Sequence, residues 1–318
     1  MKIKIFCTAL LAAAMTAAAG CSINTNSSQT DTSAGNTAEK SSVEISAAEN
    51  SAAESTAAVS ADPAADNDSE ETAGTGSASV TLNGTSAAVS EGAAGVSADG
   101  STVTVTAAGE YTFTGTLEDG QIIVNAPKEA KVDIYLNGVT VNCSSSAPVK
   151  ILSADGVTLH LVEGSTNTFT DSAASDTNAC ISAKDDLTIK GKGKLVVVGS
   201  TKHAVKTSND LRIKNGEYEL SAKGAALYGE DSVQLTGGNI LITACKDGIK
   251  SVIDVGGDAS RGVVTAENTT VDVQNAQGNG IEATSGVTVT SGSIKIHSLK
   301  QAVNCKIQNI TEGTVVKY

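Results

Sequence analysis

The chain has 318 residues, no tryptophan, three prolines and 31 glycines. This composition favours β-strands joined by tight turns over helices, and the length suits one large β domain or two ordinary ones. The formal net charge of −13 argues against nucleic acid as a partner. Binding a polyphosphate requires clustered cations, whereas arginine occurs only as Arg212 and Arg261.

Residues 1–20 have the pattern of an export signal. Lys2 and Lys4 precede an apolar run that ends in small residues directly before Cys21. This resembles a bacterial lipoprotein signal, in which Cys21 is lipidated and becomes the mature N-terminus; an ordinary cleaved secretory signal is the alternative. We therefore expect a lipid-anchored protein on the extracellular face of the cell membrane, which touches the membrane through its lipid alone. A spanning helix is disfavoured because the apolar run is short.

Residues 21–76 are rich in Ser, Ala, Thr and acidic residues and contain almost no large apolar side chain. Such a segment buries too little surface to offset the entropy lost on ordering. We expect a disordered tether between the membrane anchor and a folded head.

Residues 142–318 contain a repeat. An apolar residue that follows a small one recurs about every 22 residues, and two intervals are about ten residues longer. We call these ruler positions, and they are Val149, Ile181, Val205, Leu227, Ile249, Ile281 and Val303. The longer intervals predict inserted loops at 164–177 and 252–262.

Each repeat carries three short apolar clusters with a period of two, which predicts three strands that each bury one face. In two neighbouring repeats the second clusters are Val196/Val198 and Tyr218/Leu220. Three strands per repeat predict a single-stranded parallel β-helix, in which equivalent strands pair between coils about 4.8 Å apart and inward residues form columns. A β-sandwich is the main alternative, but it would not require columns of constant phase.

Residues 77–141 are also strand-rich but less regular. We expect them to form an N-terminal β cap and the first coils, because a solenoid end must hide an apolar cross-section and open strand edges. After Cys7 and Cys21, the remaining cysteines are Cys143, Cys180, Cys245 and Cys305. They fall in different coils or different phases of the repeat, so we expect four free thiols.

Several stretches in order resemble one known family. They are VTLNGTSAAVS, VTAAGEYTFTGTLEDGQIIVNA, VDIYLNGVTVNCSSSAPVKI, ISAKDDLTIKGKGKLVV and ACKDGIKS. The chain from about residue 77 to 318 resembles the carbohydrate-binding domain-containing proteins, which are mostly surface lipoproteins of clostridia and related anaerobes. The resemblance implies a right-handed β-helix similar in shape to pectate lyases. It also implies binding of plant-cell-wall polysaccharide, including acidic polysaccharide, and calcium ions on the helix.

An outward polar strip is the predicted glycan site. The residues that follow the ruler positions are Lys150, Ser182, Lys206, Tyr228, Lys250, Glu282 and Asn304. A second column, two residues before the ruler positions, comprises His203, Ala225, Asp247, Asn279 and Gln301, beside Lys202, Lys246 and Lys300. Lysine can pair with uronate carboxylates and Tyr228 can stack on a sugar. The alternative is that these are ordinary polar residues on the outside of a solenoid.

The turns before the first strands are rich in oxygen ligands. The candidate metal ligands are Asp185, Asp186, Asp210 and Asp231 in these turns, together with Asp247 and Asp254. Stacked carboxylates repel one another, and a bound calcium ion would relieve the repulsion. A simple turn ladder is the alternative, because Asp and Asn suit tight turns.

Three function classes follow from these features. We favour a monomeric binder of acidic polysaccharide over a cellulose binder, because Tyr228 is the one aromatic residue expected to be exposed. Bridging calcium or the lysines would overcome repulsion by the net charge. A structural adhesin or scaffold is the first alternative. A calcium-dependent lyase is the second, since Arg212 lies near the aspartates, with Lys190 and Lys214 nearby, but the residues form no recognisable catalytic motif.

Overall fold

The computed structural model describes residues 76–253, 258 and 260–318. All of them belong to the unit Asn67–Tyr318. They form strands and turns, and among them no helix is long and apolar enough to cross a membrane. The predicted signal peptide, Cys21, the tether and Asp254 lie outside the described residues.

Twenty-eight strands build the described part of the chain. The N-terminal strands are β1 (Gly76–Gly84), β2 (Ala87–Val89), β3 (Val96–Asp99), β4 (Thr102–Val105), β5 (Gly109–Leu117), β6 (Gln121–Asn125), β7 (Lys131–Cys143) and β8 (Val149–Ser153). Each later coil has a first, a second and a third strand. The first strands are β9 (Gly156–Leu161), β12 (Asp186–Gly191), β15 (Asp210–Lys214), β18 (Ser232–Thr236), β21 (Val263–Glu267), β24 (Gly286–Val289) and β27 (Ile307–Ile310).

The second and third strands follow the same order. The second strands are β10 (Thr166–Asp171), β13 (Lys194–Gly199), β16 (Glu217–Ala222), β19 (Asn239–Ala244), β22 (Thr269–Ala276), β25 (Gly292–Ser298) and β28 (Val315–Lys317). The third strands are β11 (Ala179–Ala183), β14 (His203–Thr207), β17 (Ala225–Gly229), β20 (Asp247–Ser251), β23 (Ile281–Ala283) and β26 (Val303–Asn304).

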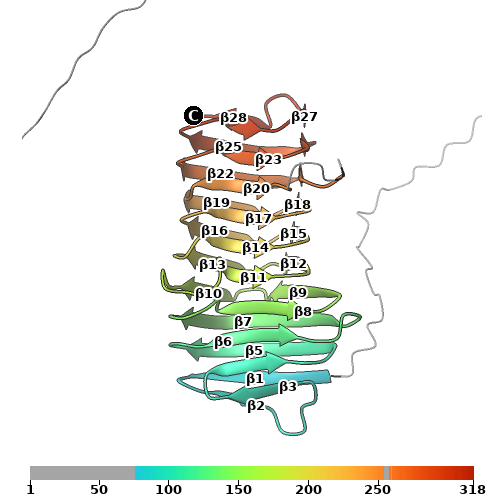
Figure 1. Cartoon of the computed structure of the whole chain (residues 1–318), viewed down its shortest axis with the longest axis vertical. Helices are drawn as coiled ribbons and strands as arrows, with labels where there is room; N and C mark the ends of the chain where they lie inside the picture. The colour runs from blue at the N-terminus through green and yellow to red at the C-terminus, as the bar shows by residue number, and fades with distance from the viewer. Residues whose placement is uncertain (1–75, 254–257, 259) are drawn as a thin grey trace, which may run out of the picture. The chain divides into compact units, whose positions relative to one another are not determined.

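The coils stack in chain order from β1 to β28 (Figure 1). The third strands form a sheet of ten strands with β3, β4, β6 and β8, while the first and second strands share a sheet of 18 strands. The face of the first strands and the face of the second strands belong to one sheet, because the long strands β5 and β7 run across both faces. The first part of β7 pairs with β9 and its last part with β10. This arrangement is the predicted parallel β-helix.

The ruler positions form one column in the interior. Val205 is the Cα partner of Ile181 and of Leu227, and the same register continues from Val149 to Val303. All of these side chains except Val303, in the last coil, are fully buried. The repeat of apolar residues therefore sets the stacking of the coils, as predicted.

The second cluster of one coil was assigned the wrong phase. In β13 the buried residues are Leu195 and Val197, whereas Val196 and Val198 point outward and are half-buried. Four consecutive apolar residues, Leu195–Val198, leave the period of two ambiguous. The register with β16 decides it, because Leu195 pairs with Tyr218 and Val197 with Leu220.

The two ends of the solenoid are closed differently. At the N-terminal end β2 and β3 add antiparallel pairings to β1 and β4, in place of another parallel coil. In the last coil two interior columns end in polar residues, since Gln308 follows Val287 and Lys317 follows Ile296. The exposed large apolar side chains of the described residues, Leu299, Ile307, Val316 and Tyr318, all lie at this C-terminal end.

The four described cysteines are free thiols, as predicted. Cys143, Cys180 and Cys245 are buried, and Cys305 is half-buried. Burial raises the pKa of the Cys180 thiol well above its usual value and that of Cys245 to about 12. These thiols stay protonated and are poor nucleophiles at neutral pH.

Candidate functional site

The predicted strip on the third strands is present as a ladder. Successive register partners place Lys150, Ser182, Lys206, Tyr228, Lys250, Glu282 and Asn304 one above the next. We call this column the third-strand strip. Its residues are each half-buried or exposed, so the sequence assigned the outward phase correctly.

The cations of the third-strand strip already have partners. The Lys206 ammonium lies 2.7 Å from a Glu230 carboxylate oxygen, and the Lys250 ammonium lies 2.8 Å from one of Glu282. The same two ammonium groups lie 5.3 and 5.9 Å from the centre of the Tyr228 ring. The Tyr228 hydroxyl donates to the Val252 carbonyl at 3.2 Å. The strip is thus a closed network whose charges are used within the protein.

The second predicted column lies inside the molecule except for Gln301 in the last coil, which is exposed, and this corrects its assignment to an outer strip. His203 and Asp247 are each 4% exposed, and Asn279 is also buried. Each accepts a backbone N–H from the following coil: Ala225 donates to His203 Nδ1 at 2.9 Å, Asn279 to Asp247 Oδ1 at 2.9 Å, and Gln301 to Asn279 Oδ1 at 3.2 Å. These side chains accept hydrogen bonds from backbone N–H groups at a turn. Side chains at a turn do not alternate between inward and outward as they do along a strand.

Burial also affects the charge of His203. Loss of solvent, followed by the nearby Lys202 and Lys206, lowers the pKa of His203 to about 3. The ring is therefore neutral at physiological pH and packs edge-on against Tyr228, with ring centres 5.1 Å apart. Lys202 and Lys246 remain exposed at the turns, beside the third-strand strip.

Arginine neutralises three of the predicted metal ligands. Arg212 pairs with both Asp186, at 2.7 Å, and Asp210, while Arg261 pairs with Asp231. Asp185 accepts the Ala154 N–H at 3.3 Å, and Asp247 is buried as described above. Among the described residues no group of three or more Asp, Glu, His or Cys side chains is arranged to hold a metal ion. The described aspartates therefore do not fit a calcium cage, and calcium binding stays a prediction.

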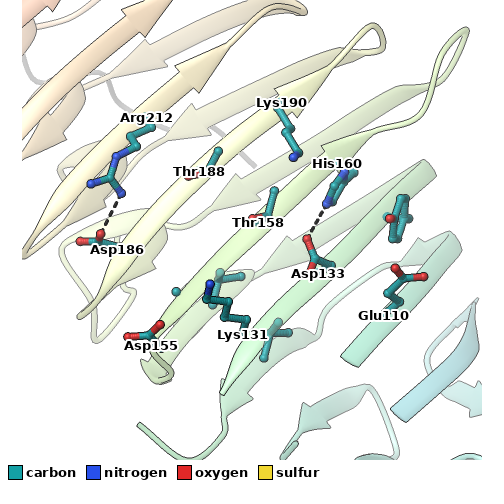
Figure 2. A pocket seen from close by; sticks show the side chains of 14 residues that line it. Glu110, Lys131, Asp133, Asp155, Thr158, His160, Asp186, Thr188, Lys190 and Arg212 are labelled. Atoms are coloured by element: carbon teal, nitrogen blue, oxygen red, sulfur yellow. Dashed lines mark hydrogen bonds and ion pairs between the residues drawn. The ribbon is translucent and has the colours of Figure 1, made fainter. Parts of the chain in front are cut away.

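A hollow on the outward face of the first strands is a second candidate site. It has a volume of about 450 Å³ and crosses β5, β7, β9, β12 and β15 (Figure 2). Its polar lining comprises Glu110, Lys131, Asp133, Tyr135, Asp155, Thr158, His160, Asp186, Thr188, Lys190 and Arg212. We call it the first-strand groove.

One wall of the first-strand groove is rigid. His160 Nε2 lies 2.7 Å from Asp133 Oδ1, and the His160 ring stacks on Tyr135 with centres 4.2 Å apart and planes at 16°. Burial, followed by the charges of Glu110 and Asp133, raises the pKa of Tyr135. The Tyr135 hydroxyl therefore stays protonated at neutral pH, when it can donate a hydrogen bond.

A ladder of basic side chains extends this wall. His160, Lys190 and Lys214 are successive register partners on β9, β12 and β15, and Figure 2 shows Lys190 beside His160. Neighbouring strands are about 4.8 Å apart, so the ladder offers one basic group per coil over three successive coils, and the next register partner, on β18, is Thr236. Within the described ranges neither Lys190 nor Lys214 forms an ion pair.

The sequence carried a signal for this ladder. Lys190 and Lys214 occupy equal positions in the stretches DLTIK and DLRIK, although the sequence by itself connects them only with the lyase alternative. The sequence did not predict that Asp133, Tyr135 and His160 lie together, because the irregular spacing of residues 77–141 concealed the register between β7 and β9.

Comparisons with known proteins agree with this architecture. A family model described as carbohydrate-binding domain-containing protein matches residues 99–315. A relative of the same description from Acetivibrio thermocellus is 40% identical over 128 residues, which cover 38% of this chain and 45% of the relative. The aligned part thus spans less than half of that relative's length.

A solved structure is also similar. It is described as the polysaccharide lyase-like protein from C. thermocellum, in a gadolinium derivative, and it is 33% identical with a TM-score of 0.72. The alignment covers 76% of this chain and 99% of that one. Because the family model matches more than half of the chain, this β-helix belongs to the family of carbohydrate-binding domain-containing proteins.

Proposed function

We propose that the first-strand groove binds polysaccharide and prefers acidic polysaccharide. The observation that carries this proposal is the basic ladder of His160, Lys190 and Lys214, whose two lysines have no ion-pair partner among the described residues. An unpaired surface lysine needs no rearrangement before it binds a carboxylate. The lysines of the third-strand strip would first have to leave Glu230 and Glu282.

The direction of the ladder suggests how a polymer would lie. Steps of about 4.8 Å run along the solenoid axis, so a chain of uronate sugars parallel to this axis could place successive carboxylates against Lys190 and Lys214. Thr158 and Thr188 are register partners beside the ladder, and their hydroxyl groups can bind sugar hydroxyls. Asp186 repels a polyanion less than a free carboxylate would, because Arg212 pairs with it, and Asp133 is hydrogen-bonded to His160.

The test is retardation in an affinity gel that contains polygalacturonate. The variant Lys190→Ala with Lys214→Ala should lose most of the retardation while its circular dichroism stays unchanged. The matched control is Lys202→Ala with Lys223→Ala, which removes two exposed lysines at turns outside the groove. Equal loss in both variants, or no loss in either, would show that the groove is not the site.

Two further arms address calcium and catalysis. If calcium bridges protein and glycan, EDTA should weaken retardation and added calcium should restore it. We infer binding without bond cleavage, so absorbance of unsaturated uronate should stay flat during incubation with pectate and calcium. A steady rise in absorbance would establish the lyase alternative.

We also propose that the head is displayed at the cell surface through a lipid on Cys21. The sequence pattern of residues 1–21 supports this. Metabolic labelling with a palmitate analogue should mark the wild-type chain and not a Cys21→Ser variant. Label in both chains would exclude Cys21 as the anchor.

A further inference from the structure

The outward face of the second strands carries a separate hollow of different character. It has a volume of about 360 Å³ and lies over β16, β19 and β22. Its outward lining includes Glu217, Glu219, Asn239, Leu241 and Asp272. We call it the second-strand groove. It shares no lining residue with the first-strand groove.

The charges in the second-strand groove favour a cation. Lys194, the cation that lines it, lies 2.8 Å from Glu219 and is already paired. Within the described ranges Glu217 forms no ion pair, and the hydrogen-bond partners of Asp272 are the neutral groups of Tyr318 and Gln274. Lys295 is the register neighbour of Asp272 on β25 but forms no ion pair with it. Lys194 is likewise the register partner of Glu217 but pairs with Glu219. Glu217 and Asp272 thus form no ion pair among the described residues, and the lining carries the three carboxylates of Glu217, Glu219 and Asp272 against Lys194.

An aromatic platform adjoins the acidic end of this groove. Tyr318 is 57% exposed, and its hydroxyl donates to Asp272 Oδ1 at 2.9 Å. Its ring stacks on His297 with centres 5.8 Å apart and planes at 26°. His297 is held in turn, because its Nδ1 donates to the Gln274 carbonyl at 2.8 Å. The ring is therefore fixed before a ligand arrives, which lowers the entropy cost of binding.

Exposure sets Tyr318 apart from the other tyrosines. Tyr111 and Tyr218 are buried, Tyr135 is covered by the His160 ring, and Tyr228 is enclosed by the third-strand strip. An exposed, immobilised ring presents a face on which the C–H groups of a pyranose can stack, and it also attracts an ammonium group. A platform beside unpaired carboxylates suits a sugar that carries a positive charge.

We propose that the second-strand groove binds a cationic amino-sugar polymer, with one pyranose on Tyr318 and ammonium groups against Asp272 and Glu217. The net charge of −13 draws such a polymer toward the protein and repels a polyuronate from this acidic face. This site does not depend on the proposed function of the first-strand groove. The same solenoid would then hold glycans of opposite charge on two of its faces.

The experiment compares two oligomers of equal length, one of β-linked glucosamine and one of its N-acetylated, neutral counterpart. Calorimetric titration of the full chain should show the glucosamine oligomer binding at least about tenfold more tightly. Asp272→Asn with Glu217→Gln should remove this preference while keeping the acceptor for the Tyr318 hydroxyl. Tyr318→Ala should weaken binding about tenfold, since stacking of a sugar on the ring is lost. Lys190→Ala, in the other groove, should change nothing.

Three results would overturn the proposal. Equal affinity for the two oligomers would show that the groove does not recognise the positive charge of the amino sugar. Unchanged affinity in the Asp272→Asn, Glu217→Gln variant would place binding elsewhere. A lysine-rich peptide that binds as tightly as the glucosamine oligomer would show that the groove is a general cation site. Loss of polygalacturonate binding in the Lys190→Ala, Lys214→Ala variant bears only on the first-strand groove, so the two proposals fail separately.

Discussion

The first-strand groove and the third-strand strip are built in the same way. In both, the register of the β-helix stacks basic side chains in a ladder on the outside of the solenoid. In the third-strand strip each central lysine pairs with a carboxylate of the next coil. Lys206 pairs with Glu230, two residues beyond its register partner Tyr228, and Lys250 pairs with its register partner Glu282. In the basic ladder that extends the wall of the first-strand groove, the residue that follows Lys190 is Lys214, and neither lysine forms an ion pair among the described residues. The neighbouring coil therefore decides whether a ladder stabilises the fold or is free to bind.

What lies beneath the two faces differs as well. The third-strand strip rests on a turn that buries His203 and Asp247, and these side chains bond to the backbone of the next coil. In the wall of the first-strand groove His160 is only half-buried and lines the hollow, where the ring can meet a ligand. The following predictions test this division between a structural face and a binding face.

The largest effect should come from lowering the pH, through His203 in the turn beneath the third-strand strip. Because His203 has a folded-state pKa of about 3, the unfolded chain takes up a proton on this side chain first, as pH falls below about 6.5. The contribution of neutral His203 to stability is complete above that pH. It should shrink by about 3 kcal/mol between pH 7 and pH 4. Urea unfolding at a series of pH values measures it.

The control for this prediction is His203→Asn, which keeps an acceptor for the Ala225 N–H but does not titrate. Its free energy of unfolding should depend less on pH than that of the wild type, by about the amount above. Parallel pH profiles of the two chains would show that His203 is not buried in its neutral form.

Tyr228→Ala should be the next largest change. It removes a ring that lies against two ammonium groups and the His203 edge, so the free energy of unfolding should fall by about 2 kcal/mol. Retardation by polygalacturonate should stay as in the wild type. The reverse pattern, normal stability with lost retardation, would restore the third-strand strip as the glycan site.

Lys214→Glu should convert the binding face into a structural one. The new carboxylate would face Lys190 across neighbouring strands, as Glu282 faces Lys250. Affinity for polygalacturonate should fall about tenfold, while stability is kept or rises by up to about 1 kcal/mol. A Lys223→Glu variant, with the same change of charge at a turn, separates local pairing from the change in net charge.

The smallest effect is expected from removing a carboxylate from the third-strand strip. Glu282→Gln leaves the shape of the third-strand strip intact and removes the partner of Lys250, so affinity for polygalacturonate should rise about twofold to threefold. The gain is limited because Asp247 also lies 3.8 Å from Lys250. Measuring both Glu282→Gln and Lys214→Glu in one affinity gel compares the two faces directly. A loss of affinity in Glu282→Gln would contradict the comparison.

Much of the fold could be predicted from spacing alone. A period of two within strands and a repeat of about 22 residues between coils leave few ways to bury Val205, Leu227 and Ile249 together. The ambiguous cases had a physical cause: Leu195–Val198 has no polar residue to mark its outer face. His203 was misplaced because it stands at the boundary of a turn, where side chains meet backbone groups of the next coil.

The amino-acid order determined the coil length, the interior columns and the ladders of outward residues, because each depends on positions that recur along the chain. The tertiary structure alone decided which outward charges are paired with partners inside the protein. Pairing of Arg212 with Asp186, of Lys206 with Glu230 and of Tyr318 with Asp272 depends on the reach and direction of side chains from different coils. A repeat fixes which residues are neighbours, but the energy of a charge depends on the atoms around it in space.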